Sequence, residues 1–216
     1  MLAKTKGEPT DRVLDQFAID LAMMDRCIRM STMAIQHGEF PFACVICKDG
    51  EVVVESTNRV ALEADVTRHA ELVAVSEAQK ILGRKDLSGC TLYSTIEPCA
   101  MCSFPIRETR IGRVVFAIAS PMMGGFSKWN VLRDPEISRV MPEAFGPVPE
   151  VISGLSRRAA EKVWWTWNPL IWWVIKQRGC FEADPGPGTY ERLQAVSERG
   201  GFLRRLLMRL HPYHST

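Results

Sequence analysis

Two short motifs most constrain what this chain can fold into. The first is His69-Ala70-Glu71, and the second is Pro98-Cys99-Ala100-Met101-Cys102. Cys99 and Cys102 are three residues apart, so they share one face if they open a helix. If the histidine and both cysteines act as one group, the fold must bring the two motifs together across the intervening segment.

Each motif carries signals for the start of a helix. Pro98 suits a first turn, where its missing N–H costs nothing and where the positive helix end lowers the pKa of a thiol. Asp65 or Thr67 is predicted to cap a helix that follows with His69 and runs to about Ile81. Two helix starts are therefore predicted to face each other.

The residue types in these motifs indicate zinc. One imidazole and two thiolates are three of the four ligands of tetrahedral zinc, and a catalytic site keeps the fourth position for water. We predict that His69, Cys99 and Cys102 bind one Zn²⁺ per subunit, and that Glu71 takes a proton from the metal-bound water to leave a zinc-bound hydroxide. An isolated C-x-x-C also occurs in redox and structural zinc sites. A structural site favours a fourth Cys or His, and none lies nearby in the sequence.

The order H-x-E and then P-C-x-x-C is the signature of zinc deaminases that act on nucleobases. The chain resembles the cytidine and deoxycytidylate deaminase superfamily through His69, Glu71, Cys99 and Cys102. Within that superfamily it looks most like the branch of tRNA adenosine deaminases and guanine or cytosine deaminases. The resemblance covers about residues 18 to 178. It implies a three-layer α/β/α fold of the cytidine deaminase type, with a central mixed sheet of about five strands.

The resemblance also implies the residues that contact the substrate. An asparagine at the spacing of Asn58 contacts the sugar or the base in such proteins, and a first-strand side chain, here Phe42, packs against the base. Backbone N–H groups near Ala70 and Cys99 would steady the ring substituents, and Pro98 is also expected to contact the substrate. A turn-forming asparagine is the alternative for Asn58.

Periodicity and turn signals along the chain predict an α/β fold with helices on both sides of one sheet. The predicted helices cover 11–37, the histidine segment to about 81, the cysteine segment to about 108, and 156–167. The predicted strands cover 39–47, 51–55, 90–95, 111–119 and 150–152, the first two joined as a hairpin at Asp49-Gly50. Cys44 and Cys47 are expected in the core, because strand residues three apart point to opposite faces.

The 216 residues suit one domain with an appendage. We predict an N-terminal arm at 1–11, a zinc-dependent deaminase domain at 12–180, and a linker with a basic C-terminal helical extension at 181–216. That extension would contact phosphates, an acidic partner or a membrane surface, or be a solvated helix. The sequence shows no membrane-spanning run and no signal peptide, which predicts a cytoplasmic protein.

The predicted function is hydrolytic release of ammonia from a free nucleobase or nucleoside. A formal net charge of +2 favours a small substrate, as does the apolar, glycine-rich stretch 120–130, where tRNA-editing proteins of the resembling family carry acidic and lysine residues. Gly124-Gly125 would also let this stretch move as a lid. A tRNA-specific adenosine deaminase is the alternative, favoured by the arginines near the C-terminus.

A second alternative is a catalytically inactive zinc protein that binds partners through its tryptophans. Five tryptophans lie between residues 164 and 173, and either core or dimer packing or a platform for stacking bases would explain them. Members of the resembling family are commonly dimers or tetramers, so we expect a homodimer. The expected partners are thus a small nucleobase or nucleoside, or tRNA, and no membrane.

Overall fold

The computed structural model of the chain describes residues 9–181. The predicted basic extension and most of the predicted N-terminal arm lie outside these residues. The helices within this range are α1 (Pro9–Gln36), α2 (Val60–Glu63), α3 (Ala70–Leu82), α4 (Ala100–Glu108), α5 (Pro135–Val140), α6 (Arg157–Trp167) and α7 (Pro169–Gln177). The strands are β1 (Ala43–Lys48), β2 (Glu51–Thr57), β3 (Cys90–Ile96), β4 (Arg113–Ile118) and β5 (Glu150–Ser153).

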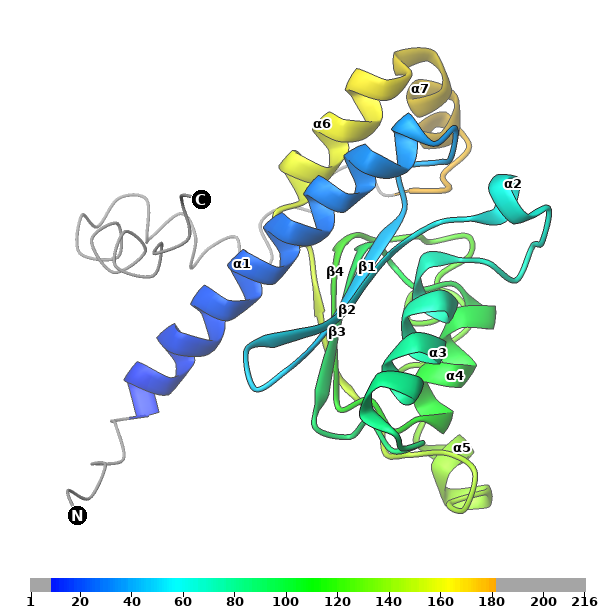
Figure 1. Cartoon of the computed structure of the whole chain (residues 1–216). Coiled ribbons are helices and arrows are strands. Elements are labelled where there is room, and N and C mark those ends of the chain that lie inside the picture. Colours follow the sequence, from blue (N-terminus) through cyan, green and yellow to red (C-terminus); the bar gives the residue numbers. More distant parts are fainter. Residues whose placement is uncertain (1–8, 182–216) are drawn as a thin grey trace.

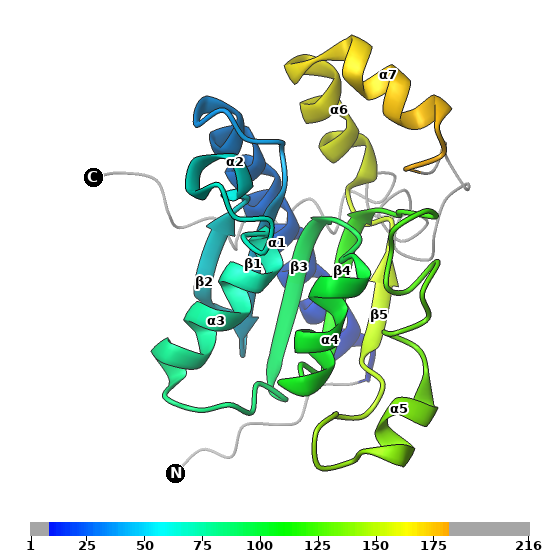
Figure 2. The same cartoon turned by 90° about the vertical axis from the view of Figure 1, so that its right-hand side faces the viewer.

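The five strands form one mixed sheet in the order β2-β1-β3-β4-β5 (Figure 2). Strand β1 is antiparallel to both β2 and β3, whereas β3, β4 and β5 are parallel. Asp49 and Gly50 join β1 to β2 with φ angles of 53° and 82°, the left-handed conformation that a two-residue hairpin turn requires. The predicted hairpin and the predicted edge strand at 150–152 are both present.

Helices cover both faces of this sheet. Helices α1 and α6 lie on one face, and α3 and α4 lie on the other, while α7 folds back beside α6 (Figure 1). This arrangement confirms the predicted three-layer α/β/α fold. Within the described part of the chain, no helix is long and apolar enough to cross a membrane.

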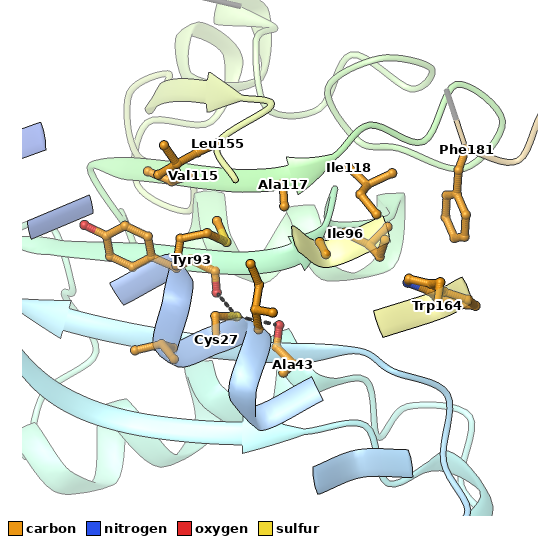
Figure 3. Packing of buried hydrophobic residues seen from close by; sticks show 14 of the residues in the cluster. Cys27, Ala43, Tyr93, Ile96, Val115, Ala117, Ile118, Leu155, Trp164 and Phe181 are labelled. Carbon is orange, nitrogen blue, oxygen red and sulfur yellow. Dashed lines mark hydrogen bonds between the residues drawn. The ribbon is translucent and has the colours of Figure 1, made fainter. Parts of the chain in front are cut away.

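Alternating side chains of the central strands fill a core on each side of the sheet. Tyr93 and Val115 pack beneath α1 and α6 with Trp164 (Figure 3), and their neighbours Leu92 and Phe116 pack beneath α3 and α4. Cys44 and Cys47 are 0% and 3% exposed and belong to opposite cores, as the strand periodicity predicts.

The tryptophans divide between the core and the surface. Trp164 and Trp172 are 1% and 4% exposed, whereas Trp165 and Trp173 are 57% and 56% exposed. Two of the five tryptophans therefore have the predicted core role, whereas Trp165 of α6 and Trp173 of α7 are exposed. Dimer packing and base stacking stay predictions for that exposed pair.

A buried charged pair fixes α1 to the sheet. Asp20 of α1 is fully buried and accepts hydrogen bonds from Arg113 Nη1 and Nη2 at 2.6 and 2.7 Å. The Tyr93 hydroxyl donates to the same carboxylate at 2.8 Å. Because Tyr93 lies on β3 and Arg113 opens β4, this cluster joins the longest helix to the two central strands.

Candidate functional site

The two helix starts meet beyond the carboxyl end of β3, but their caps differ from the sequence prediction. His69 itself is the N-cap of α3, and Asp65 instead accepts from the backbone N–H and hydroxyl of Thr67 in a turn before the helix. Cys99 is the N-cap of α4, so Pro98 precedes the helix and does not lie in its first turn. Extended backbone at both cap positions directs the two cap side chains out of their helices toward each other.

His69, Cys99 and Cys102 form the cluster that the motif spacing predicts. The Nδ1 atom of His69 is 3.6 Å from Cys99 Sγ and 3.5 Å from Cys102 Sγ, and the two Sγ atoms are 3.5 Å apart. Ligands of a tetrahedral zinc ion, at roughly 2.0 to 2.3 Å from the metal, stand about 3.5 to 3.8 Å from one another. The three donor atoms therefore fit zinc, and they are the one such group of His, Cys, Asp or Glu side chains among the described residues.

The two thiols differ in their ease of ionisation. A hydrogen bond from Cys102, together with the neighbouring His69, lowers the pKa of the Cys99 thiol to about 4. Cys102 is fully buried, and its hydrogen bond to Cys99 together with this burial raises its pKa. A cation placed between the sulfur atoms would favour both thiolates, which are the forms that ligate zinc.

Glu71 lies beside this cluster at the bottom of a pocket. Its side chain is buried, and one oxygen, Oε1, accepts a hydrogen bond from the Ser94 hydroxyl at 2.8 Å. The other oxygen, Oε2, is 3.6 Å from Cys102 Sγ. Burial raises the pKa of Glu71, and the Ser94 hydrogen bond opposes that shift. The carboxylate is thus suited to taking up a proton next to the cysteines.

The pocket offers about 80 Å³ of space for the centre of a water-sized sphere. A single water needs only about 10 to 15 Å³ by the same measure, so the pocket accepts a larger group. Five of its lining residues were expected from the sequence: Phe42, Asn58, His69, Glu71 and Cys99. Five others were not: Ile96, Glu97, Ser120, Met123 and Phe181. Two expected contacts, Ala70 and Pro98, are not among the lining residues.

Asn58 lines the pocket, and its side chain is held there by Glu39, a partner that the sequence did not indicate. Its Nδ2 donates to Glu39 Oε2 at 2.7 Å, and the second oxygen of Glu39 accepts from the Leu62 backbone N–H at 2.8 Å. Both side chains are almost fully buried, at 5% exposure for Asn58 and 2% for Glu39. Asn58 therefore does more than form a turn, since its amide is locked at the pocket wall.

Glu97 fixes the loop that follows β4. Its carboxylate accepts from the backbone N–H groups of Ser120, Phe126 and Ser127 at 2.8, 2.9 and 2.6 Å, and from the Ser127 hydroxyl at 2.6 Å. A Cβ atom on Gly124 would overlap this carboxylate, so the glycine is needed for close packing. The proposed lid is therefore unnecessary to explain Gly124, because the loop is tied to Glu97.

Phe181 closes the pocket from the side of α6 and α7. Its ring packs against Trp164 and Trp172 at centroid distances of 5.3 and 5.8 Å, and Figure 3 shows it beyond Ile96 and Ile118. The Ser120 hydroxyl donates to the Cys180 carbonyl at 3.0 Å and ties this segment to the loop after β4. Phe181 lies one residue past the predicted end of the domain, and an aromatic residue after a turn gives no local signal of such a contact.

Comparison with known proteins shows which family the chain resembles. Residues 18–118 match the family model for the cytidine and deoxycytidylate deaminase zinc-binding region. The tRNA-specific adenosine deaminase of Aquifex aeolicus is 36% identical over 130 residues, which cover 60% of this chain and 86% of that protein. A probable cytosine deaminase of Schizosaccharomyces pombe is 40% identical over 101 residues, which cover 47% of this chain and 61% of that protein.

A solved structure shows that the fold is shared as well. A tRNA:A34 deaminase superposes with a TM-score of 0.57 at 30% sequence identity, covering 66% of this chain and 98% of that one. About a third of the present chain therefore lies outside that match. The zinc-binding motif, the His/Cys/Cys cluster and the shared fold lead to one assignment. This chain belongs to the cytidine and deoxycytidylate deaminase family of zinc-binding proteins.

Proposed function

We propose that the protein is a zinc-dependent hydrolytic deaminase that releases ammonia from a free nucleobase or nucleoside. His69, Cys99 and Cys102 would hold the zinc, which when bound supplies the Lewis acidity that lets a water molecule lose its proton near neutral pH. Glu71 would accept this proton and pass it to a ring nitrogen while the water oxygen bonds to the amino-bearing carbon. Glu71 would then carry the second proton of that oxygen to the amino group, which leaves as ammonia as the carbonyl forms.

The contacts of Glu71 support this role. Ser94 occupies its Oε1, which leaves Oε2 on the side of the cysteines where the proton has to be taken up. Phe42 and Asn58 line the same pocket and would hold the ring. Neither Ala70 nor Pro98 lines the pocket, so the lining does not support the further contacts proposed for the backbone near these residues.

The closure of the pocket by Phe181 is the observation that carries the choice of a small substrate. Phe181, Met123 and Ile96 give the pocket apolar walls, and no lysine or arginine is among the described residues that line it. Nucleic-acid binding relies on cationic and polar contacts to phosphates. A free ring needs only the enclosed apolar space and a few polar groups.

The second candidate is a tRNA-specific adenosine deaminase, which flips its base out of the RNA before the reaction. The observation in its favour is the similarity to the tRNA deaminase of Aquifex aeolicus, of which this chain spans 86%. A flipped nucleotide would have to carry its sugar and phosphates past Phe181. The candidate therefore requires a different position of the segment around Cys180 and Phe181 when RNA is bound.

The test is ammonia release by the zinc-loaded full chain against a panel of free bases and nucleosides, beside sequencing of total tRNA incubated with the same protein. Turnover of a small molecule is the expected result. Conversion of adenosine in tRNA without small-molecule turnover would overturn the proposal in favour of the second candidate. The matched control is Glu71→Gln, which should keep zinc and lose about 10²- to 10⁴-fold in rate.

Absence of turnover on every substrate, with zinc bound, would support the inactive binding protein instead. The cytoplasmic location, the homodimer and the division of the chain at residues 11 and 180 stay predictions. Size measurement by light scattering would test the homodimer directly.

A further inference from the structure

The pair of Glu39 and Asn58 determines which end of an amide group faces the pocket. In its ionised form a carboxylate can only accept hydrogen bonds, whereas an asparagine amide has a donor end and an acceptor end. The group that meets Glu39 Oε2 at 2.7 Å must therefore be the Nδ2 end of Asn58. This contact removes the usual ambiguity between the two ends of an amide.

Glu39 is itself held in place, so it can impose this orientation. Its Oε1 accepts from the backbone N–H of Leu62 at 2.8 Å, and the residue is 2% exposed. A backbone N–H cannot reverse its polarity. The carboxylate therefore has one oxygen fixed by the main chain and the other directed at the Asn58 amide.

The remaining end of the amide, Oδ1 of Asn58, has no hydrogen-bond donor within residues 9–181. Oδ1 is also not among the fully buried side-chain atoms of that part of the chain that lack a hydrogen-bond partner, so a ligand can reach it. Asn58 lines the pocket, and because Glu39 holds its Nδ2, Oδ1 is the end of the amide left for a ligand. A buried acceptor costs free energy unless a donor reaches it, so a ligand that brings an N–H group is favoured.

We infer that Glu39 is a positioning residue that turns the carbonyl of Asn58 into the pocket, so that the site selects a ring carrying an N–H donor at that point. This inference rests on the proposed deaminase function and narrows its substrate class. A free base has a ring N–H at the nitrogen that a sugar occupies in a nucleoside. Rings in which the relevant nitrogen is substituted would leave Oδ1 unpaired.

An exchange of the two residues tests the inference. Asn58→Asp alone places two carboxylates in contact. In Glu39→Gln alone, the glutamine oxygen stays on the Leu62 N–H and its NH₂ group faces residue 58, so the Asn58 amide must turn over and present its own NH₂ to the pocket. In the double variant Glu39→Gln/Asn58→Asp, the new glutamine donates to the new aspartate, whose other oxygen still presents an acceptor to the pocket. The net charge of the pair is conserved, so the exchange keeps the acceptor while reversing the bond that holds it.

The variants are compared on the substrate that the wild-type protein deaminates, with zinc content and thermal midpoint measured for each. We expect each single variant to lose about 5- to 150-fold in kcat/KM, the range for one unmade buried hydrogen bond, and the exchange to recover most of it. If the folded, zinc-loaded exchange is as impaired as Asn58→Asp, Asn58 must present its N–H to the substrate, and the inference is wrong.

A second readout separates positioning from a merely structural role. Guanine is compared with 1-, 7- and 9-methylguanine, and cytosine with 1-methylcytosine, as substrates or as competitive inhibitors of the wild-type reaction. The methyl group has the same volume in every variant, so differences between variants report the hydrogen bond. We expect methylation at one nitrogen to be penalised in the wild type and in the exchange, and less in Glu39→Gln.

Equal penalties in all three proteins would also overturn the inference, since Glu39 would then only stabilise the short helix α2, which contains Leu62. The proposed function is judged separately, by which substrate the wild-type protein deaminates. If that substrate is tRNA, the comparison of single variants with the exchange is made on it, and the inference can stand or fall while the proposed function fails.

Discussion

Replacing Glu97 with alanine tests how the loop after β4 is held at the pocket. The change leaves three backbone N–H groups without an acceptor, those of Ser120, Phe126 and Ser127. An unsatisfied buried donor costs about 1 to 3 kcal/mol. Ser120 is buried, whereas Phe126 and Ser127 are half-buried and can regain water, so we expect a total loss of about 3 to 5 kcal/mol in the free energy of unfolding.

Glu97→Gln gives a graded comparison. Its carbonyl can keep the two N–H groups now bound to Oε1, and the Ser127 hydroxyl can rotate to accept from the new NH₂ group. The Ser120 N–H alone is left facing a donor. We therefore expect a loss of about 1 to 3 kcal/mol for the glutamine variant.

Urea unfolding of the zinc-saturated proteins measures both losses, with Glu108→Ala as the control. Glu108 is exposed on α4, and a surface substitution of this kind should stay within about 0.5 kcal/mol. Because Ser120 and Met123 line the pocket, KM should rise in the Glu97 variants while zinc content is unchanged. A loss below about 1 kcal/mol for Glu97→Ala, or equal losses for both variants, would refute this account of the loop.

Three further predictions concern the core, the proton carrier and the metal. Arg113→Met should lower the free energy of unfolding by about 3 to 5 kcal/mol, because it leaves the Asp20 carboxylate buried without its cation. Adding Asp20→Asn should recover part of that loss. Urea unfolding measures both variants, and a loss below about 1 kcal/mol for Arg113→Met would contradict the prediction. Ser94→Ala removes the hydroxyl that donates to Glu71 and should lower kcat, but by less than the factor of about 10² to 10⁴ expected for loss of Glu71 itself. Ser94→Thr keeps the hydroxyl and should keep the rate. An unchanged kcat in the alanine variant would show that Glu71 does not need the hydrogen bond from Ser94. Removal of the metal by a chelator should abolish turnover and lower the thermal midpoint, because zinc at 100 times its Kd adds about 2.7 kcal/mol to the free energy of unfolding. Adding zinc back should restore both. Activity in protein verified to be free of metal would rule out the proposed chemistry.

The zinc cluster and the order of the main elements could be predicted because their signals are local. His69, Cys99 and Cys102 are defined by residue type and spacing, and the sheet follows from short apolar runs and one Asp-Gly turn. The caps were misplaced because Asp65 has the right residue type for a cap, yet its side chain closes a turn with Thr67 four residues before the cap His69. Residue type alone does not distinguish these two uses of an aspartate.

The residues that shape the pocket were missed because their roles depend on distant partners. Glu39 meets Asn58 at a separation of 19 residues, and Ser94 meets Glu71 at 23. Phe181 reaches the pocket only because α6 and α7 form a hairpin that returns it to the sheet. The short helices α2 and α5 were not predicted either, since elements of four and six residues carry too few positions for a periodic pattern.

The long connection from β4 to β5 is held by two side chains of opposite polarity. Glu97 accepts from N–H groups in its first part, and Arg107, which is 1% exposed on α4, donates to the carbonyls of Val131, Asp134 and Gly146 in its second part. Glu97 also accepts from the Ser127 hydroxyl and Arg107 also donates to the Ser138 hydroxyl, but most bonds of both anchors are to main-chain atoms, which do not depend on the side chain of any residue other than proline.

The exposed side chains of this connection can therefore change while its path is kept, whereas Gly124 cannot, because a Cβ atom there would overlap Glu97. Met122 and Met123 are 54% and 46% exposed, and Met123 also lines the pocket. Selection, in nature or in the laboratory, could vary these positions to alter which rings enter without rebuilding the loop. Because Glu97 and Arg107 hold its main chain, the connection between β4 and β5 can change substrate preference while the metal centre stays the same.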